Sequence, residues 1–220
     1  MVRAFLSLCV VMFGLSATCA AAQTFRGCKG LQEATIMSVL PGAEDLAMRA
    51  GAAIGDTPEY AHWFGVYSPK YAEEVRGNFK NIHRAIAREE LEFVCGSARS
   101  NDCNGIYAYV YTTEHYVVTL CPDFFDMPTM QGGSASDPDY ENGTMEGTII
   151  HEISHFEVVA GTEDFCYSRS DCGLMGPRTP EDAIANADTY QYFAEDVSFA
   201  VIANEEQPVA SEFVPVPPKP

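Results

Sequence analysis

The first half of the chain contains long segments with helical periodicity, separated by short polar breaks. Residues 31–53 are rich in alanine and leucine and predict a helix with a kink or break at Pro41 and Gly42. Ser68 and Pro69 have the form of a helix start. Behind them one apolar face recurs at the spacing i, i+4, i+7 and i+11, at Val75, Phe79, Ile82 and Ile86. We expect this face to lie in the core.

In the middle of the chain the pattern changes to β-branched and aromatic residues. Residues 91–95, 106–111 and 116–121 predict three strands, and the last two flank a short polar turn. They indicate a hairpin in a small antiparallel or mixed sheet. Residues 129–143 are rich in Gly, Ser and Asp and predict a loop.

Helical periodicity returns in the last third of the chain. It predicts one helix over about residues 145–160 and another from Thr179-Pro180 to about residue 196. Residues 205–220 contain five prolines and no amphipathic period, which is typical of a flexible tail. These patterns together predict an α+β, mostly helical fold.

Residues 1–22 have the organisation of a secretory signal peptide. Arg3 precedes an apolar run over 4–17 that is too short to span a bilayer, and small residues follow at Ala20, Ala21 and Ala22. We therefore divide the chain into a signal peptide (1–22), one domain (23–203) and a proline-rich tail (204–220). Export implies a secreted, extracellular protein, with the periplasm as the alternative compartment.

Composition and charge narrow the classes of partner. The 220 residues are 47% hydrophobic and 20% charged, which is typical of one globular domain. The formal net charge of −18 would repel phosphate backbones, so we expect no nucleic-acid partner. No later apolar run is long enough for a membrane span, so we expect no membrane association after signal removal. We also expect a monomer.

Six of the eight cysteines follow the predicted signal peptide. An even number of cysteines in an exported chain indicates disulfides rather than reactive thiols, and six cysteines allow 15 pairings. No pair has the Cys-x-x-Cys spacing of a zinc knuckle. The cysteines are Cys28, Cys95, Cys103, Cys121, Cys166 and Cys172.

The strongest chemical signal is the motif His151-Glu152-Ile153-Ser154-His155. On a helix, His151 and His155 lie one turn apart and can present two imidazoles to one metal ion. Glu152 lies beside them, in position to take a proton from a water molecule. Apolar residues around the motif would bury this helix, which favours a functional site over two incidental surface histidines.

A catalytic zinc ion needs a third protein ligand. Asp164 is the nearest candidate, because the chain leaves the helix at Gly161 and can turn back over the metal. Glu181 and Glu195, on the later helix, are the alternatives. The remaining histidines lie in contexts that favour structural or surface roles: His62, His83 and His115.

These residues resemble the signature of the aspzincin metallopeptidases, which comprise the deuterolysins and the fungal peptidyl-Lys metalloendopeptidases. That signature is His-Glu-x-x-His followed by Gly-Thr-x-Asp-x-x-Tyr-Gly, and Ser168 replaces its last glycine. The resemblance covers about residues 25–200, and segments 60–65, 107–111 and 186–193 resemble the peptidyl-Lys branch. The signature is matched at His151, Glu152, His155, Gly161, Thr162, Asp164 and Tyr167.

The resemblance implies a zincin-like fold and one catalytic zinc ion (Zn²⁺) held by His151, His155 and Asp164. It implies that Glu152 is the general base and that Tyr167 donates its hydroxyl to the oxyanion of the tetrahedral intermediate. The alternative for Tyr167 is an ordinary packed aromatic residue.

The resemblance also implies two disulfides, Cys28–Cys95 and Cys103–Cys121. The remaining cysteines, Cys166 and Cys172, would then pair and close a tight loop around Tyr167. This third bridge and Ser168 depart from the family pattern, so they could either stiffen the catalytic loop or weaken the activity.

In the peptidyl-Lys branch, the resemblance implies an acidic pocket built by an aspartate and a glutamate three residues apart. Those positions are Asp188 and Gln191 here, and the i, i+3 spacing places both on one helix face. One charge instead of two predicts a preference for lysine just after the cut bond (P1′), less strict than in the relatives. The alternative for Asp188 is an ordinary surface acid.

We therefore expect a secreted zinc endopeptidase that acts on proteins or peptides. The alternative is a catalytically weak or inactive exported binding protein that retains the zincin fold. Asn142-Gly143-Thr144 is a glycosylation sequon, which has meaning only in a eukaryotic secretory route.

Overall fold

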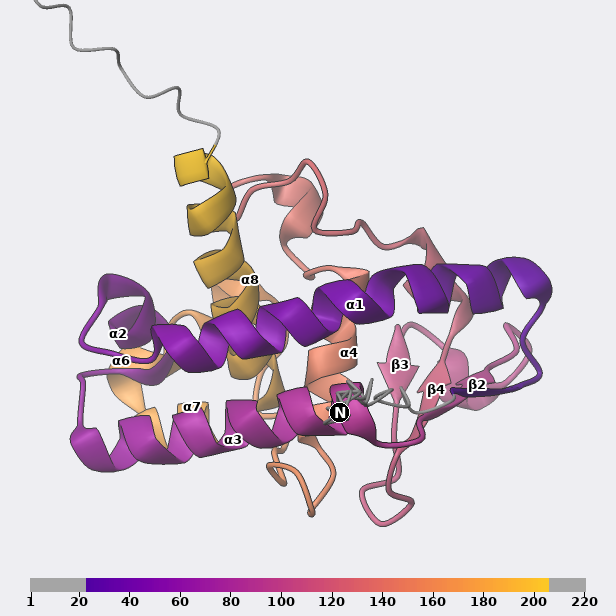
Figure 1. Cartoon of the computed structure of the whole chain (residues 1–220), viewed down its shortest axis with the longest axis horizontal. Coiled ribbons are helices and arrows are strands. Elements are labelled where there is room, and N and C mark those ends of the chain that lie inside the picture. The colour runs from indigo at the N-terminus through magenta and orange to yellow at the C-terminus, as the bar shows by residue number, and fades with distance from the viewer. Residues whose placement is uncertain (1–22, 206–220) are drawn as a thin grey trace, which may run out of the picture.

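The computed structural model describes residues 23–205. Two long helices, α1 (Gly30–Ala53) and α3 (Pro69–Arg88), lie side by side, and the short α2 (Pro58–Phe64) lies between them in sequence (Figure 1). The apolar face predicted from Val75, Phe79, Ile82 and Ile86 is the buried face of α3.

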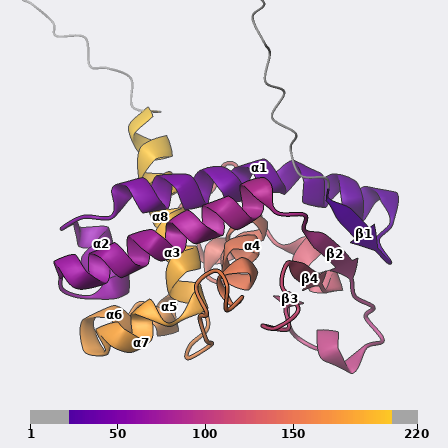
Figure 2. The ribbon, with the colours of Figure 1, turned by 60° about the horizontal axis from the view of Figure 1, so that its bottom comes forward.

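A small mixed sheet lies at the end of the molecule where α1 begins (Figure 2). Its strands, β1 (Thr24–Arg26), β2 (Glu92–Cys95), β3 (Ala108–Tyr109) and β4 (Val117–Leu120), follow the order β1-β2-β4-β3. β1 and β4 pair parallel to β2, whereas β3 and β4 form the predicted antiparallel pair. The sequence pattern did not predict β1, because three residues are too few to show a period.

The second half of the chain is mostly helical. α4 (Met145–Ser154) and α8 (Ala187–Glu205) pack against each other and against α1. Three short helices precede α8: α5 (Arg169–Cys172), α6 (Met175–Arg178) and α7 (Pro180–Ile184). Short 3₁₀ turns lie at Asn101–Cys103, Pro122–Asp126 and Pro138–Tyr140. The predicted α+β, mostly helical fold is confirmed.

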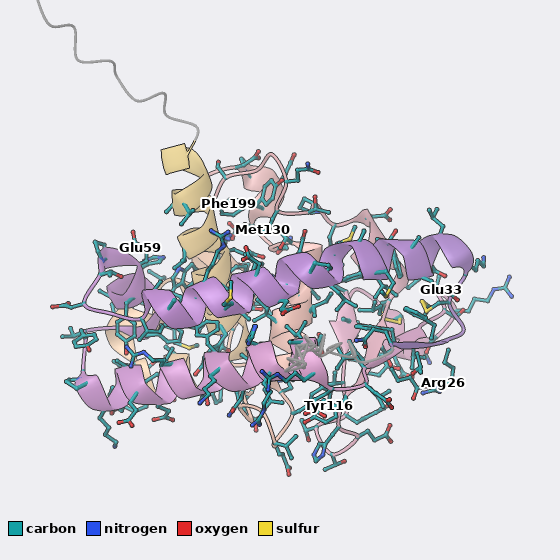
Figure 3. The ribbon with its side chains drawn as sticks, in the orientation of Figure 1. Arg26, Glu33, Glu59, Tyr116, Met130 and Phe199 are labelled. Atoms are coloured by element: carbon teal, nitrogen blue, oxygen red, sulfur yellow. A yellow bond between two sulfur atoms is a disulfide. The ribbon has the colours of Figure 1, made fainter. Side chains whose placement is uncertain are left out.

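Aromatic side chains fill the core between α2, α3 and α8. The ring of Phe64 lies 5.3 Å from those of Tyr190 and Phe193, and Phe79 contacts the same two rings. Met130 and Phe199, labelled in Figure 3, belong to the same core. This packing holds α8 in place as a rigid support for α4.

Pro41 does not break α1, so the break predicted as one of two outcomes at Pro41 and Gly42 is wrong. The helix continues without interruption, with Pro41 on its exposed side and Val39, Leu40 and Ala43 buried. Burial of this face outweighs the backbone hydrogen bond that the proline cannot form.

Two other predicted helices differ from the structure. α4 ends at Ser154 rather than near residue 160, because the N–H of Thr162 returns to the carbonyl of Ser154 at 3.2 Å. The helix predicted from Thr179 is divided into α7 and α8, because Asn186 forms a β-bridge with Glu163. Both differences bring residues 161–168 back against α4 and α8.

All three predicted disulfides are present: Cys28–Cys95, Cys103–Cys121 and Cys166–Cys172. Within residues 23–205, no helix has the length and apolar character needed to cross a membrane. The predicted signal peptide and residues 206–220 lie outside the described residues, and α8 includes residues 204 and 205 of the predicted tail.

Candidate metal centre

α4 directs the two motif histidines toward one point. Thr144 caps the helix by accepting a hydrogen bond from the N–H of Gly147, and three isoleucines of its apolar face are fully buried. His151 lies in the last turn and His155 just beyond it, with their Nε2 atoms 3.1 Å apart. Their side chains are only 10% and 9% exposed.

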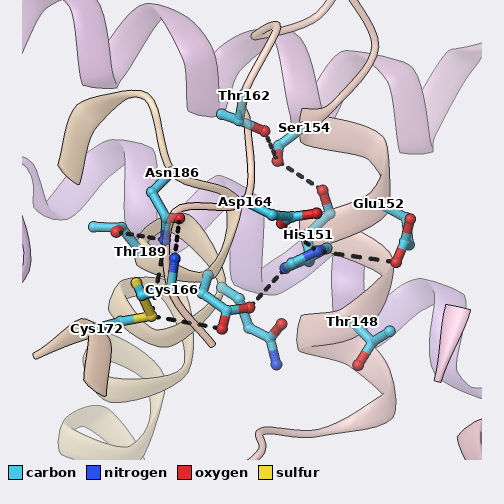
Figure 4. Close-up of polar contacts among 12 residues, drawn as sticks. Thr148, His151, Glu152, Ser154, Thr162, Asp164, Cys166, Cys172, Asn186 and Thr189 are labelled. Carbon is cyan, nitrogen blue, oxygen red and sulfur yellow. Dashed lines mark hydrogen bonds and ion pairs between the residues drawn. A yellow bond between two sulfur atoms is a disulfide. The ribbon is translucent and has the colours of Figure 1, made fainter. Parts of the chain in front are cut away.

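Asp164 joins the histidines by a reversal of the chain after α4. The reversal occurs at Gly161, whose φ of +60° is the left-handed conformation that glycine tolerates best. Oδ1 of Asp164 lies 3.3 Å from Nε2 of both His151 and His155. Figure 4 labels Asp164 and His151. The Asp164 side chain is 33% exposed, so the group opens to solvent on this side.

Asn186 anchors the segment that carries Asp164. Its Oδ1 accepts a hydrogen bond from the backbone N–H of Phe165 at 2.8 Å. It also accepts one from the backbone N–H of Cys166 at 3.3 Å (Figure 4). The N–H of Glu163 donates to Ala185, and that of Ala187 donates to Glu163. Sequence reasoning noted Asn186 only as part of the family resemblance and assigned it no role.

The three side chains fit a zinc ion. One ligand atom from each of His151, His155 and Asp164 lies within 4.8 Å of the other two. A tetrahedral zinc ion with bonds of about 2.0–2.1 Å separates its ligand atoms by about 3.3 Å, close to the distances found here. Two imidazoles and one carboxylate are also a donor set that zinc accepts.

The remaining ring nitrogens of the histidines have partners that leave both Nε2 atoms for a metal. Nδ1 of His151 lies 2.7 Å from Oδ1 of Asp188, and Nδ1 of His155 lies 2.8 Å from the carbonyl of Thr162. Both partners accept hydrogen bonds, so both Nδ1 atoms carry the proton. Such contacts fix the tautomer and orientation of metal-binding imidazoles.

The histidines and Asp164 shift the pKa values of one another. Burial lowers the pKa of His151, but hydrogen bonds to Asp164 and Asp188 outweigh it and raise the pKa well above the ordinary value. Burial raises the pKa of Asp164, but its contacts with the two histidines prevail and lower it strongly. These contacts therefore favour the ionised form of the Asp164 carboxylate beside the two histidines.

Glu152 and Tyr167 lie beside this group without joining it. Oε1 of Glu152 is 4.0 Å from Nε2 of His151, and burial raises the pKa of Glu152 above that of an ordinary glutamate. Tyr167 is 62% exposed. Partial burial and then the charge of Asp164 raise the pKa of Tyr167 to about 12, so its hydroxyl keeps its proton at neutral pH.

The other candidate ligands lie elsewhere. Glu181 accepts a hydrogen bond from Tyr71, and the fully buried Glu195 pairs with Arg169 and Thr144. Neither glutamate belongs to the metal-binding group found within residues 23–205. The same holds for the histidines expected to be structural, His62, His83 and His115.

Asp188 and Gln191 occupy buried positions that the sequence did not reveal. Asp188 is 4% exposed, and its second oxygen accepts the N–H of Ser168 at 3.0 Å. Gln191 is 3% exposed and donates to Glu195 at 3.4 Å. Asp188 is therefore not a surface acid: both of its oxygens are engaged within the protein.

Comparison with known proteins places these residues in a family. A sequence profile described as lysine-specific metallo-endopeptidase, the aspzincin group, matches residues 49–195. The chain belongs to the aspzincin metallopeptidase family. Members of this family use zinc. The resemblance seen in the sequence is thereby confirmed.

Individual aspzincin relatives support the assignment. An extracellular protease of Aeromonas hydrophila is 34% identical over 80% of this chain and 48% of its own length. A peptidyl-Lys metalloendopeptidase of Armillaria mellea is 30% identical over 79% of this chain and 46% of its own length. The peptidyl-Lys metalloendopeptidase of Pleurotus ostreatus is 29% identical over 79% of this chain and 96% of its own length. The chain thus spans about half the length of the first two relatives.

A solved zinc peptidase structure confirms the fold. The zinc peptidase from Grifola frondosa superposes with a TM-score of 0.65 at 24% identity, over 77% of this chain and 97% of that chain. The predicted zincin-like architecture is therefore confirmed.

Proposed function

We propose that this chain is a secreted zinc-dependent endopeptidase that hydrolyses peptide bonds in proteins and peptides. The observation that carries the proposal is the convergence of His151, His155 and Asp164, with Glu152 beside them and outside the ligand set. A zinc ion held by the three ligands would supply Lewis acidity, which polarises the scissile carbonyl and lowers the pKa of a water molecule.

The residues around the metal centre have complementary roles in this proposal. Glu152 accepts the proton of the attacking water and passes it to the leaving amine; its raised pKa suits a group that both takes and returns a proton. Tyr167 keeps its proton at neutral pH and donates a hydrogen bond to the oxyanion.

A zinc and activity assay tests the proposal. Purified protein should contain one zinc ion per chain and digest casein, whereas Asp164→Ala should lose zinc affinity and activity together. A protein that binds zinc and peptides but digests no casein would instead be the exported binding protein that retains the fold. Such a result would overturn the proposed activity.

We also propose that the enzyme prefers lysine just after the cut bond, with Asp188 as the attracting charge. The family description and the names of the fungal relatives support this preference. Because Asp188 already holds His151 and Ser168, a substrate ammonium would share an engaged carboxylate, which favours a less strict preference. Gln191 adds no charge to this region.

Mapping cleavage sites in a denatured protein mixture by mass spectrometry tests the lysine preference. Lysine should be enriched after the cut bond, with a minority of other residues. Asp188→Asn, assayed with saturating zinc, should reduce that enrichment. Wild-type sites without lysine enrichment would contradict the preference while leaving the endopeptidase proposal intact.

Secretion rests on the three disulfides and on the extracellular relative of Aeromonas hydrophila. Disulfides persist in oxidising compartments. We propose an extracellular or periplasmic monomer. Fractionation of the source culture and size-exclusion chromatography of the purified protein test these two points separately.

A further inference from the structure

Arg169 follows the Tyr167-Ser168 step and lies inside the loop closed by the Cys166–Cys172 disulfide. Its side chain is 9% exposed and forms ion pairs of 2.5 Å with Glu195 and Asp196 on α8. Nε donates to the carbonyl of Tyr140 at 3.0 Å. The guanidinium also lies over the ring of Tyr192, 4.8 Å from its centroid. One side chain thus ties this loop to α8 and to the segment before α4.

Glu195 extends this connection to the helix that carries the histidines. It is fully buried, and its Oε1 accepts hydrogen bonds from the N–H and hydroxyl of Thr144, at 2.9 and 2.8 Å. Thr144 is the N-cap of α4. Arg169, Glu195 and Thr144 therefore connect the loop of Tyr167 with the first turn of α4.

The backbone beside Tyr167 is held at two further points. Ser168 has a φ of +72°, and its N–H donates to Asp188, whose other oxygen holds His151. The N–H of Arg169 donates to the carbonyl of Glu141 at 3.0 Å. Because Tyr167 itself is 62% exposed, this anchored backbone fixes where its hydroxyl points more than side-chain packing does.

We propose that Arg169 is a positioning residue: its fork to Glu195 and Asp196 holds the backbone that directs the Tyr167 hydroxyl toward the metal centre. This inference rests on the proposed endopeptidase function with Tyr167 as hydroxyl donor. A guanidinium holds two carboxylates in fixed directions, whereas the ammonium of lysine is a mobile point charge. Arg169→Lys therefore keeps a positive charge beside the buried Glu195. It removes the planar guanidinium that holds the Glu195 and Asp196 carboxylates in fixed directions.

A double-mutant cycle tests the proposal. Arg169→Lys should retain zinc content and lower kcat by on the order of 10-fold to 100-fold, with KM nearly unchanged. In a Tyr167→Phe background the same change should have almost no further effect, because the hydroxyl that it misplaces is gone. Arg49→Lys, at an exposed arginine paired with Asp45, is the matched control and should keep wild-type kinetics.

Either of two results would overturn the inference and leave the endopeptidase proposal standing. One is a wild-type kcat for Arg169→Lys, and the other is an equal loss of kcat in the wild-type and Tyr167→Phe backgrounds. Wild-type activity of Tyr167→Phe alone would overturn the proposed role of Tyr167 and the inference with it. If Arg169→Lys does not fold, Asp196→Asn replaces it, because Asp196 is 19% exposed and Glu195 still pairs with Arg169. Asp196→Asn should lower kcat less than Arg169→Lys does, and this loss should also vanish in the Tyr167→Phe background. A loss of kcat that persists in that background overturns the inference.

Discussion

Asp188 of α8 accepts a hydrogen bond from His151 of α4, with 2.7 Å between Oδ1 and Nδ1. Its other oxygen accepts the N–H of Ser168 at 3.0 Å. One buried carboxylate thus contacts both a proposed zinc ligand and the loop that carries Tyr167. A carboxylate in this position orients a metal-binding imidazole and raises its basicity.

Replacing Asp188 with asparagine should weaken zinc binding. Asp188 holds His151 and Ser168 with different oxygens, and the amide replaces one of these acceptors with an NH₂ donor. The amide also lacks the charge that raises the basicity of the imidazole. We expect the zinc affinity to fall on the order of 10-fold to 100-fold in competition with a chromophoric chelator. Asp182→Asn, at an exposed residue of α7, is the matched control. Unchanged zinc affinity in Asp188→Asn would show that its hydrogen bond does not support the metal.

Replacing Glu152 with alanine should separate zinc binding from catalysis. Glu152 lies 4.0 Å from the ring of His151 and outside the three-residue ligand group, so zinc content should stay near that of the wild type. Casein digestion should fall on the order of 10²-fold to 10⁴-fold, because the water loses its proton acceptor. Digestion near the wild-type rate would rule out Glu152 as the general base.

Removing the metal should abolish activity while leaving the secondary structure largely intact. The proposed ligands lie on elements held by the aromatic core, by Asn186 and by three disulfides. The far-ultraviolet circular dichroism should therefore change little. Zinc added back at about 100 times its dissociation constant should stabilise the fold by about 2.7 kcal/mol in thermal unfolding. Magnesium is the control and should not restore activity, because it prefers oxygen ligands. Full activity in excess chelator would contradict a metal-dependent mechanism.

Replacing Glu146 with glutamine should stabilise the protein at neutral pH. Glu146 is 7% exposed, and burial raises its pKa above the ordinary value. Between the unfolded and folded pKa values the folded state binds more protons, so this group makes stability fall as pH rises. The glutamine amide has no charge to bury, and its oxygen can still accept the hydrogen bond from the N–H of Met130. We expect the free energy of unfolding of Glu146→Gln to exceed that of the wild type by on the order of 1 kcal/mol at pH 7. This difference should be lost below about pH 4.

Glu141 provides a control of opposite sign for that experiment. Hydrogen bonds from Ser170 lower the pKa of Glu141, so its contribution is present at neutral pH and lost as pH falls through the folded pKa. Glu141→Gln should therefore destabilise the protein at pH 7. Denaturant unfolding at pH 4 and pH 7 measures both variants, and equal stability of Glu146→Gln and wild type at pH 7 would contradict the burial argument.

The sequence alone determined those features of this protein that depend on local spacing. His151 and His155 lie one helical turn apart wherever that helix forms, and Val75, Phe79 and Ile82 share one face of α3 for the same reason. The even set of cysteines, together with the family resemblance, predicted all three disulfides. Asp164 was the favoured third ligand because only a short turn separates it from α4.

Only the tertiary structure decided which distant residues support that motif. The break between α7 and α8 exists because Asn186 binds the Asp164 segment, and Pro41 stays helical because its neighbours are buried. Asp188 and Arg169 have no sequence signal for their contacts with His151 and Glu195, since those partners lie 37 and 26 residues away. Local periodicity carries no information about which buried charges meet across packed helices, because that pairing depends on how α4 and α8 pack against each other.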